Sequence, residues 1–248
     1  MSLVDVHTEW DPLEEIIVGT MTGAQMAIAD RSLPTAEYPD IDDPRQIPTG
    51  AYPSDVVEPT EAELEELLDL LTDLGVTVRR PGGRDHTSVG STPDRNTDGL
   101  SDRCPRGGFP AAGTSIIGAP KVPRARRLEE TAYEDLLPEY PEPGARRLPA
   151  ALGDRYTVHA CEGPYPSTRR DDGAPDHPRS SVWIGMNFLV IAPGKAVVDK
   201  RRPGPVPEPE RHGVTVIPSQ PAPSGTPGGE LPCVTFDVRR RDELASYW

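Results

Sequence analysis

Cysteine is scarce in this chain: Cys104, Cys161 and Cys233 are the only three in 248 residues, and they lie far apart. An odd number of scattered cysteines, with no CxxC pair and no His-x-x-x-His spacing, excludes a disulfide framework and gives no sign of a structural zinc site. We therefore expect a reducing, cytoplasmic location. The first seven residues lack the pattern of a signal peptide, and no apolar run approaches the roughly 18 residues of a membrane span, so no membrane partner is expected.

Basic residues are also few: the chain has 26 Lys and Arg residues and 40 Asp and Glu residues, which gives a net charge of −14. A surface that binds nucleic acid needs a basic stripe, and the arginines here are scattered among carboxylates. We therefore expect no nucleic-acid partner. An acidic chain suits a cationic small substrate, although acidic surfaces mostly serve solubility.

Aromatic residues make up 5% of the chain, whereas 31 prolines and 23 glycines predict many loops. The hydrophobic content of 35% over this length is enough for one domain, which we place at residues 1–248.

The clearest helix is predicted at residues 60–74, where Thr60 and Glu63 form a capping box behind Pro59 and leucines line one face. Gly75 is expected to end it and to lead into a strand at 76–78. The other expected elements are an acidic loop at 24–55, strands at 13–19, 113–119 and 213–217, a second helix at 124–140, and a hairpin pairing 182–191 with 196–199. Alternating strands and helices predict an α/β or α+β fold.

Cys233 lies between a Gly228-Gly229 turn and a short apolar strand, with Arg239, Arg240 and Arg241 just downstream. This setting can lower the pKa of a thiol and make it a nucleophile. An isolated cysteine is more often a small buried hydrophobe, so this interpretation depends on the surrounding residues. We expect the three arginines to form structural salt bridges and to give some assistance to formation of the Cys233 thiolate.

Residues 9–19, from Glu9 to Gly19, and residues 228–247, which include Cys233, resemble the amidinotransferases, the family of glycine amidinotransferase and the inosamine-phosphate amidinotransferases. Segments 75–81, 92–100, 104–126 and 180–199 resemble intervening parts of that family in the same order. The resemblance is strongest in 9–140 and 180–247, whereas 141–179 is shortened.

The resemblance implies a pentein-type α/β propeller of ββαβ units, truncated or incomplete in this chain. It implies transfer of an amidino group from L-arginine, a guanidino donor, to an amine acceptor, with no metal and no organic cofactor. By the same resemblance Cys233 is the catalytic nucleophile, and Ser180, Ser181 and Arg106 bind substrate.

The chain departs from the family where polar side chains are expected. Pro232 replaces the histidine before the cysteine, Gly107 replaces the aspartate of a Pro-Arg-Asp motif, and Gly118 replaces a glutamate. The family's aspartate and histidine motifs between the second helix and the late hairpin are not found. His177, Asp176 and Asp237 are the candidates for an acid/base role, whereas His159 is better interpreted as a core histidine.

Three interpretations stay open. The chain is an enzyme with a non-standard acid/base partner, a catalytically impaired pseudoenzyme that serves as a binding or scaffold protein, or a shortened product without selected activity. Lost propeller units would expose sheet edges, so we also expect a homo-oligomer.

Overall fold

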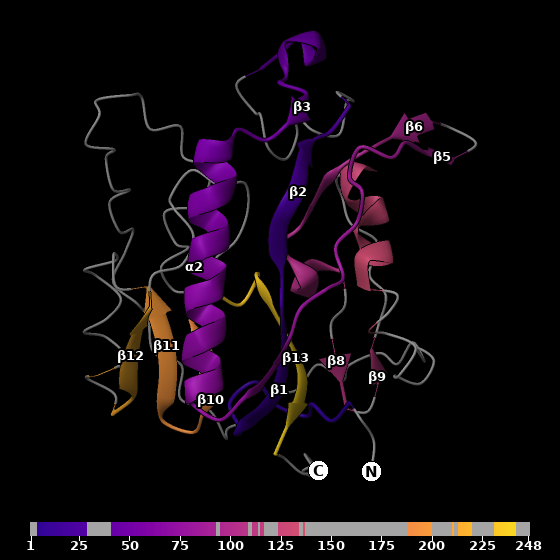
Figure 1. Ribbon diagram of the computed structural model, residues 1–248. Helices are drawn as coiled ribbons and strands as arrows, with labels where there is room; N and C mark the ends of the chain where they lie inside the picture. Colours follow the sequence, from indigo (N-terminus) through magenta and orange to yellow (C-terminus); the bar gives the residue numbers. More distant parts are fainter. Residues whose placement is uncertain are drawn as a thin grey trace.

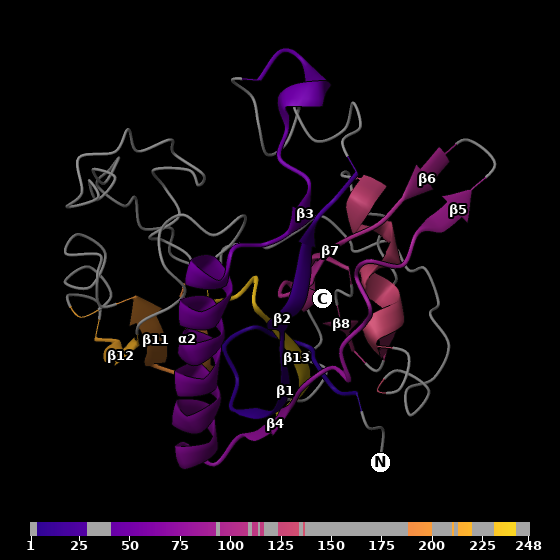
Figure 2. The same ribbon diagram turned by 45° about the horizontal axis from the view of Figure 1, so that its top comes forward.

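A computed structural model describes residues 4–28, 41–92, 95–108, 111–113, 115–116, 124–133, 136, 188–199, 210, 213–219 and 231–241. Within these residues the strands form three sheets of three strands and two sheets of two strands, and α2 (Ser54–Asp73) is the long helix. In Figure 1 and Figure 2, α2 lies in front of the strands, with β11 and β12 to one side of it and β1 and β2 to the other, and β10 contacts β1. No described helix is long and apolar enough to cross a membrane.

The central sheet joins the two ends of the chain. Its order is β13 (Thr235–Arg240), β1 (Leu13–Val18) and β4 (Thr77–Arg79), with β13 antiparallel and β4 parallel to β1. The register pairs Ile16 with Asp237 and Val18 with Thr235. The two segments that resemble the amidinotransferases most clearly are therefore neighbouring strands (Figure 1).

The other strands form smaller sheets around this centre. One sheet has the order β3 (Gly50–Ala51), β2 (Thr20–Met26), β7 (Leu100–Asp102), and another has the order β10 (Leu189–Ala192), β11 (Lys195–Asp199), β12 (Thr215–Ser219). Two hairpins pair β5 (Gly90–Thr92) with β6 (Arg95–Thr97) and β8 (Ala111–Ala112) with β9 (Ser115–Ile116). The 3₁₀ helices are η1 (Pro44–Gln46), η2 (Pro105–Gly107) and η3 (Arg124–Tyr133).

β1 is buried on both faces, because its Ile16-Ile17-Val18 run is apolar without alternation. Ile16 and Val18 pack with the α2 leucines, with β10 and β11, and with Leu231 and Val234 from the segment before β13. On the other face, Ile17 belongs to a second cluster. The strand thus anchors the chain segment that carries Cys233.

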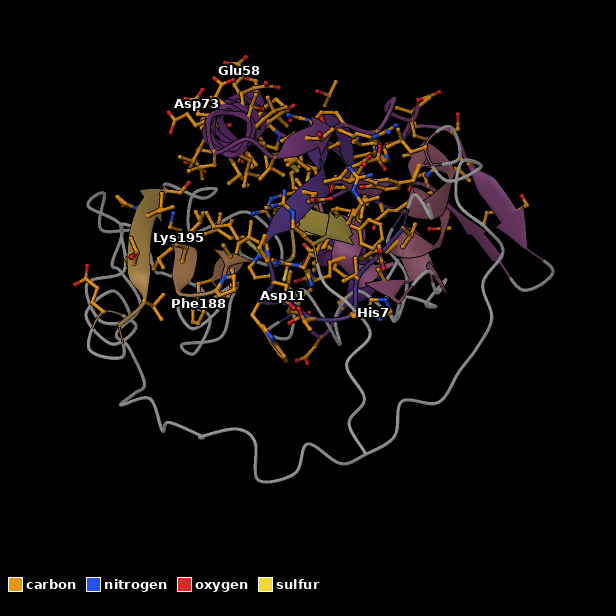
Figure 3. The ribbon with its side chains drawn as sticks, turned by 90° about the horizontal axis from the view of Figure 1, so that it is seen from below. His7, Asp11, Glu58, Asp73, Phe188 and Lys195 are labelled. Atoms are coloured by element: carbon orange, nitrogen blue, oxygen red, sulfur yellow. The ribbon has the colours of Figure 1, made fainter. Side chains whose placement is uncertain are left out.

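The helix α2 starts earlier than predicted, and the predicted capping box is wrong. Pro53 is the N-cap, Pro59 lies inside the helix, and Thr60 Oγ1 donates to the Val56 carbonyl at 2.6 Å. The early start is favoured by Val57, which packs against the core. Leu64, Leu67 and Leu71 form the predicted apolar face. Figure 3 shows Glu58 and Asp73 on α2 pointing away from the sheets.

Other predictions hold in part. Strand β1 and the hairpin turn at 192–195 are as expected, whereas residues 182–187 and 117–119 lie outside the described residues. The loop predicted at 24–55 contains the end of β2, η1, β3 and the first residues of α2. The second helix predicted at 124–140 is a 3₁₀ helix at Arg124–Tyr133, where Arg126 pairs with Glu129 at the i, i+3 spacing that such a helix aligns. Leu136 lies in a turn.

Candidate active site

Cys233 lies in the turn formed by residues 231–234, directly before β13. Leu231 and Val234 on either side of it are buried in the main core, with 0% and 2% of their surface exposed. Cys233 itself is half-buried and is a thiol, not half of a disulfide. The sequence predicted a short apolar strand directly after Cys233, and the structure places the cysteine in a turn that leads into β13.

The carbonyl groups of this turn are held by hydrogen bonds from three parts of the chain. The Gly19 N–H donates to the Val234 carbonyl at 2.9 Å, and Thr235 Oγ1 donates to the Leu231 carbonyl at 2.9 Å. Arg106 Nε donates to the Pro232 carbonyl at 2.7 Å. The residues before and after Cys233 are therefore fixed by atoms outside the turn's own backbone.

Arg106 reaches the turn from η2, the short 3₁₀ helix that follows β7. Pro105 begins η2, and the Gly108 N–H closes it on the Pro105 carbonyl at 2.9 Å. Besides its bond to Pro232, Arg106 donates from Nη2 to Asp237 Oδ1 at 2.8 Å and from Nη1 to Glu9 Oε1 at 3.0 Å. Each of its three nitrogens thus has a protein partner, and its predicted role in substrate binding stays a prediction.

Asp237 is buried and contacts two guanidinium groups. Its Oδ1 accepts from Arg106, and its Oδ2 accepts from Arg240 Nη2 at 2.7 Å and Nε at 3.0 Å. Arg240, itself buried, also donates to the carbonyls of Asp11 at 2.6 Å and Val190 at 2.8 Å. Asp237 is therefore the centre of a network that joins β13, η2 and β10, and its acid/base role stays a prediction.

The arginines downstream of Cys233 are paired with carboxylates, as the sequence predicted. Glu14 accepts from Arg239 Nε and from Arg241 Nε, each at 2.9 Å, and Arg239 also lies 3.4 Å from Glu15. The hydrogen bond from Arg241, assisted by Arg239, lowers the pKa of Glu14 below its usual value against the opposing effect of burial. Both carboxylates belong to β1, so these ion pairs connect the end of β13 to β1.

Several predicted site residues lie outside the described part of the chain: Asp176, His177, Ser180 and Ser181, together with His159. Their roles stay predictions. Among the described residues, no three His, Cys, Asp or Glu side chains lie close enough to hold a metal ion.

A buried histidine–aspartate pair was not predicted. His86 Nε2 lies 2.9 Å from Asp102 Oδ2, both side chains are fully buried, and the Tyr133 hydroxyl donates to the Asp102 carbonyl at 2.6 Å. Burial, followed by the charges of Asp102 and Glu129, raises the pKa of Tyr133 well above its usual value. His86 follows Asp85 in a segment that reads as a loop, so the sequence carries no signal for this pairing.

Gly107, where the family motif has an aspartate, faces the guanidinium group of Arg126. A Cβ atom at Gly107 would lie 3.6 Å from Arg126 Nη2, an ordinary contact distance. Arg126 itself pairs with the buried Glu129 at 3.0 Å. A Cβ atom at Gly107 would therefore make an ordinary contact with a cationic side chain.

The chain matches no protein-family model, but it matches curated proteins and solved structures. It is 39% identical to inosamine-phosphate amidinotransferase 1 of Streptomyces glaucescens over 100% of this chain and 99% of that protein. Its fold matches the solved structure of the inosamine-phosphate amidinotransferase StrB1 from Streptomyces griseus with a TM-score of 0.80, at 37% identity and over 100% and 99% of the two chains.

The chain belongs to the amidinotransferase family. The predicted family and fold class are confirmed: the fold matches an amidinotransferase structure, and the described residues have mixed α and β content with small sheets. The alignment with the S. glaucescens amidinotransferase extends over 346 residues, whereas this chain has 248, so that relative carries internal residues without a counterpart here. A more distant match, at 35% identity over 56% of this chain and 39% of the other protein, is the L-arginine:L-lysine amidinotransferase of Pseudomonas savastanoi pv. phaseolicola.

Proposed function

We propose that this amidinotransferase moves an amidino group from L-arginine, a guanidino donor, to an amine acceptor through a covalent intermediate on Cys233. The observation that carries the proposal is the position of Cys233. It is a half-buried thiol in a turn held at the residues on both sides, at the head of the strand that pairs with β1. A nucleophile held in one orientation gains rate over one that moves freely.

The proposed reaction has two balanced steps. In the first, the thiolate sulfur attacks the guanidinium carbon, the bond from that carbon to the donor's side-chain nitrogen breaks, and ornithine leaves after its nitrogen takes a proton. In the second, the acceptor amine attacks the same carbon, the carbon–sulfur bond breaks, and the amine gives up a proton. A delocalised guanidinium is a poor electrophile, so both steps need proton transfer as well as a strong nucleophile.

The remaining roles are assigned on the family resemblance. Ser180 and Ser181 would hydrogen-bond the bound substrate, and the proton would pass through His177, Asp176 or Asp237. The names of the relatives suggest an inosamine phosphate or an amino acid such as lysine as acceptor. Neither metal nor organic cofactor takes part in these steps. A homo-oligomer in the cytoplasm stays the expected form.

Intact-protein mass spectrometry of the full chain incubated with L-arginine tests this function. We expect an amidino adduct and release of ornithine in the wild type, and neither in Cys233→Ala. Cys104→Ala is the matched control, because Cys104 is also half-buried and packs against the same core. An adduct that persists in Cys233→Ala, or no adduct and no ornithine in the wild type, would contradict the proposal.

We propose as the alternative a pseudoenzyme that binds a guanidino compound or a partner protein without turnover. The observation in its favour is Gly107, which provides no carboxylate where the family motif has one. Loss of a positioning group or of a general acid/base lowers rates by about 10²–10⁴. Ornithine release distinguishes the two functions, since the alternative predicts none. Calorimetry with L-arginine then shows whether the pseudoenzyme binds a guanidino compound: heat of binding without ornithine supports that form of the alternative.

A further inference from the structure

We propose that Arg106 is a positioning residue for Cys233, and that with Asp237 it forms a brace across the turn before β13. The inference deepens the proposed function, on which its kinetic part rests. Arg106 contacts the residue immediately before Cys233 through the Pro232 carbonyl, and it contacts Asp237 four positions after Cys233. One guanidinium group therefore binds a residue before Cys233 and a residue after it.

The geometry of a guanidinium group makes this contact rigid. Its nitrogens lie in one plane and donate in fixed directions, so partners bound to different nitrogens are held in a fixed relation. The bonds of 2.7 Å from Nε to Pro232 and 2.8 Å from Nη2 to Asp237 thus fix the turn relative to the first residues of β13. A lysine ammonium would keep the charge but could not hold the same two partners in this plane.

The brace is anchored to the rest of the fold on its Asp237 side. Arg240 donates to the second oxygen of Asp237, and it also donates to the carbonyls of Asp11 and Val190. Asp237 and Arg240 are 3% and 2% exposed. Asp237 is therefore held by buried partners of its own, so Arg106 connects the turn to a fixed point of the fold.

The charge of Arg106 is largely balanced where it lies. Asp237 is on one nitrogen and Glu9 on another, at 2.8 and 3.0 Å. Its contribution to Cys233 is consequently an orientation effect more than an electrostatic one. This account also gives Pro232 a role: a proline has no N–H, but its carbonyl is the atom that the brace holds.

The test compares wild type with Arg106→Lys and Arg106→Gln, and uses Arg241→Ala as the control. Arg241 is another arginine near the end of the described chain that pairs with a carboxylate, Glu14, but it does not touch the turn. Hydrogen–deuterium exchange is measured on the peptide that contains residues 231–236, and kcat and KM for L-arginine are measured from ornithine release. Thermal melting checks that each variant is folded.

We expect exchange in the 231–236 peptide to accelerate about tenfold in both Arg106 variants and to stay unchanged in Arg241→Ala. We expect kcat to fall about 100-fold, the effect of a misplaced reacting group, with KM changed less than threefold. Unchanged exchange in folded Arg106 variants would overturn the brace. A raised KM with kcat intact would overturn it as well, and would assign Arg106 to substrate binding. If the wild type releases no ornithine, the proposed function fails, whereas the exchange measurement still decides the brace.

Discussion

Gly19 and Arg103 touch through their backbones: a Cβ atom at Gly19 would lie 2.1 Å from the Arg103 carbonyl oxygen. The same glycine donates its N–H to Val234, next to Cys233. Gly19→Ala must therefore push the end of β1 away from the Arg103 backbone, and overpacking of this kind costs about 1–3 kcal/mol in the free energy of unfolding. Urea denaturation measures it, and we expect a loss toward the upper end of that range.

Gly107→Ala is the control for this steric argument, because the nearest atom to its Cβ position is 3.6 Å away and belongs to the flexible Arg126 side chain. We expect its free energy of unfolding to stay within about 0.5 kcal/mol of wild type. Equal losses in Gly19→Ala and Gly107→Ala would mean that the contact with Arg103 does not decide the effect.

The buried pair of His86 and Asp102 is expected to be strongly coupled. His86→Leu leaves the fully buried Asp102 carboxylate without the His86 ring nitrogen, and breaking a buried pair on one side costs about 3–5 kcal/mol in the free energy of unfolding. Replacement of both residues by leucine removes both polar groups and should recover much of that loss. A double-mutant cycle by urea denaturation checks this, and additive single losses would contradict the coupling.

Glu14 should make stability depend on pH. Its pKa in the folded protein is lowered, chiefly by the hydrogen bond from Arg241, so its stabilising contribution is present above the unfolded value of 4.5 and is lost as pH falls through the folded value. Glu14→Gln should therefore be less stable than wild type at pH 7 by about 0.5 kcal/mol, and the difference should shrink as the pH falls below 4.5.

The control for this pH dependence is Glu66→Gln. Glu66 is exposed on α2 and has no ion pair within the described residues. Stability measured by urea denaturation from pH 3 to pH 7 should be the same in Glu66→Gln and wild type. A Glu14→Gln profile parallel to wild type over that range would contradict the assignment.

By the family resemblance, the aspartate of the Pro-Arg-Asp motif grips the cationic donor, so we expect Gly107→Asp to strengthen the reaction. A Cβ atom at this position makes only ordinary contacts, with the guanidinium group of Arg126, so we expect the variant to fold. We expect the rate of ornithine release to rise by about 100-fold, the lower end of the range for one electrostatic group in an active site. Gly107→Asn has the same shape without the charge. A rate equal in the Asp and Asn variants, or no rise in either, would contradict this role.

Local patterns in the sequence were sufficient for elements whose signal lies within a few residues. The apolar run of β1, the leucine face of α2 and the turn between β10 and β11 were all predicted, because burial and turn chemistry are encoded in neighbouring residues. The start of α2 was missed because Pro59 suggests a helix start, and the contacts of Val57 with the core cannot be seen in the sequence.

Cys233 was proposed from its flanking glycines and from the family resemblance, and its catalytic role stays a prediction. The contacts around it were not predicted. The bonds of Arg106 to Pro232 and Asp237 join residues more than a hundred positions apart, so no local pattern indicates them. His86 and Asp102 are closer in sequence, but they belong to different parts of the fold. Asp102 ends β7, which pairs with β2, and His86 lies in the segment after β4, so their contact depends on the tertiary structure.

The most direct measurement follows the guanidino carbon of L-arginine. The full chain is incubated with L-arginine labelled at that carbon, quenched in acid and digested, and its cysteine-containing peptides are mapped by mass spectrometry. The account predicts label on the Cys233 peptide, ornithine in equal amount, and loss of the label when an amine acceptor is added. Label that is absent from Cys233, or that lies on Cys104 or Cys161 instead, would contradict it.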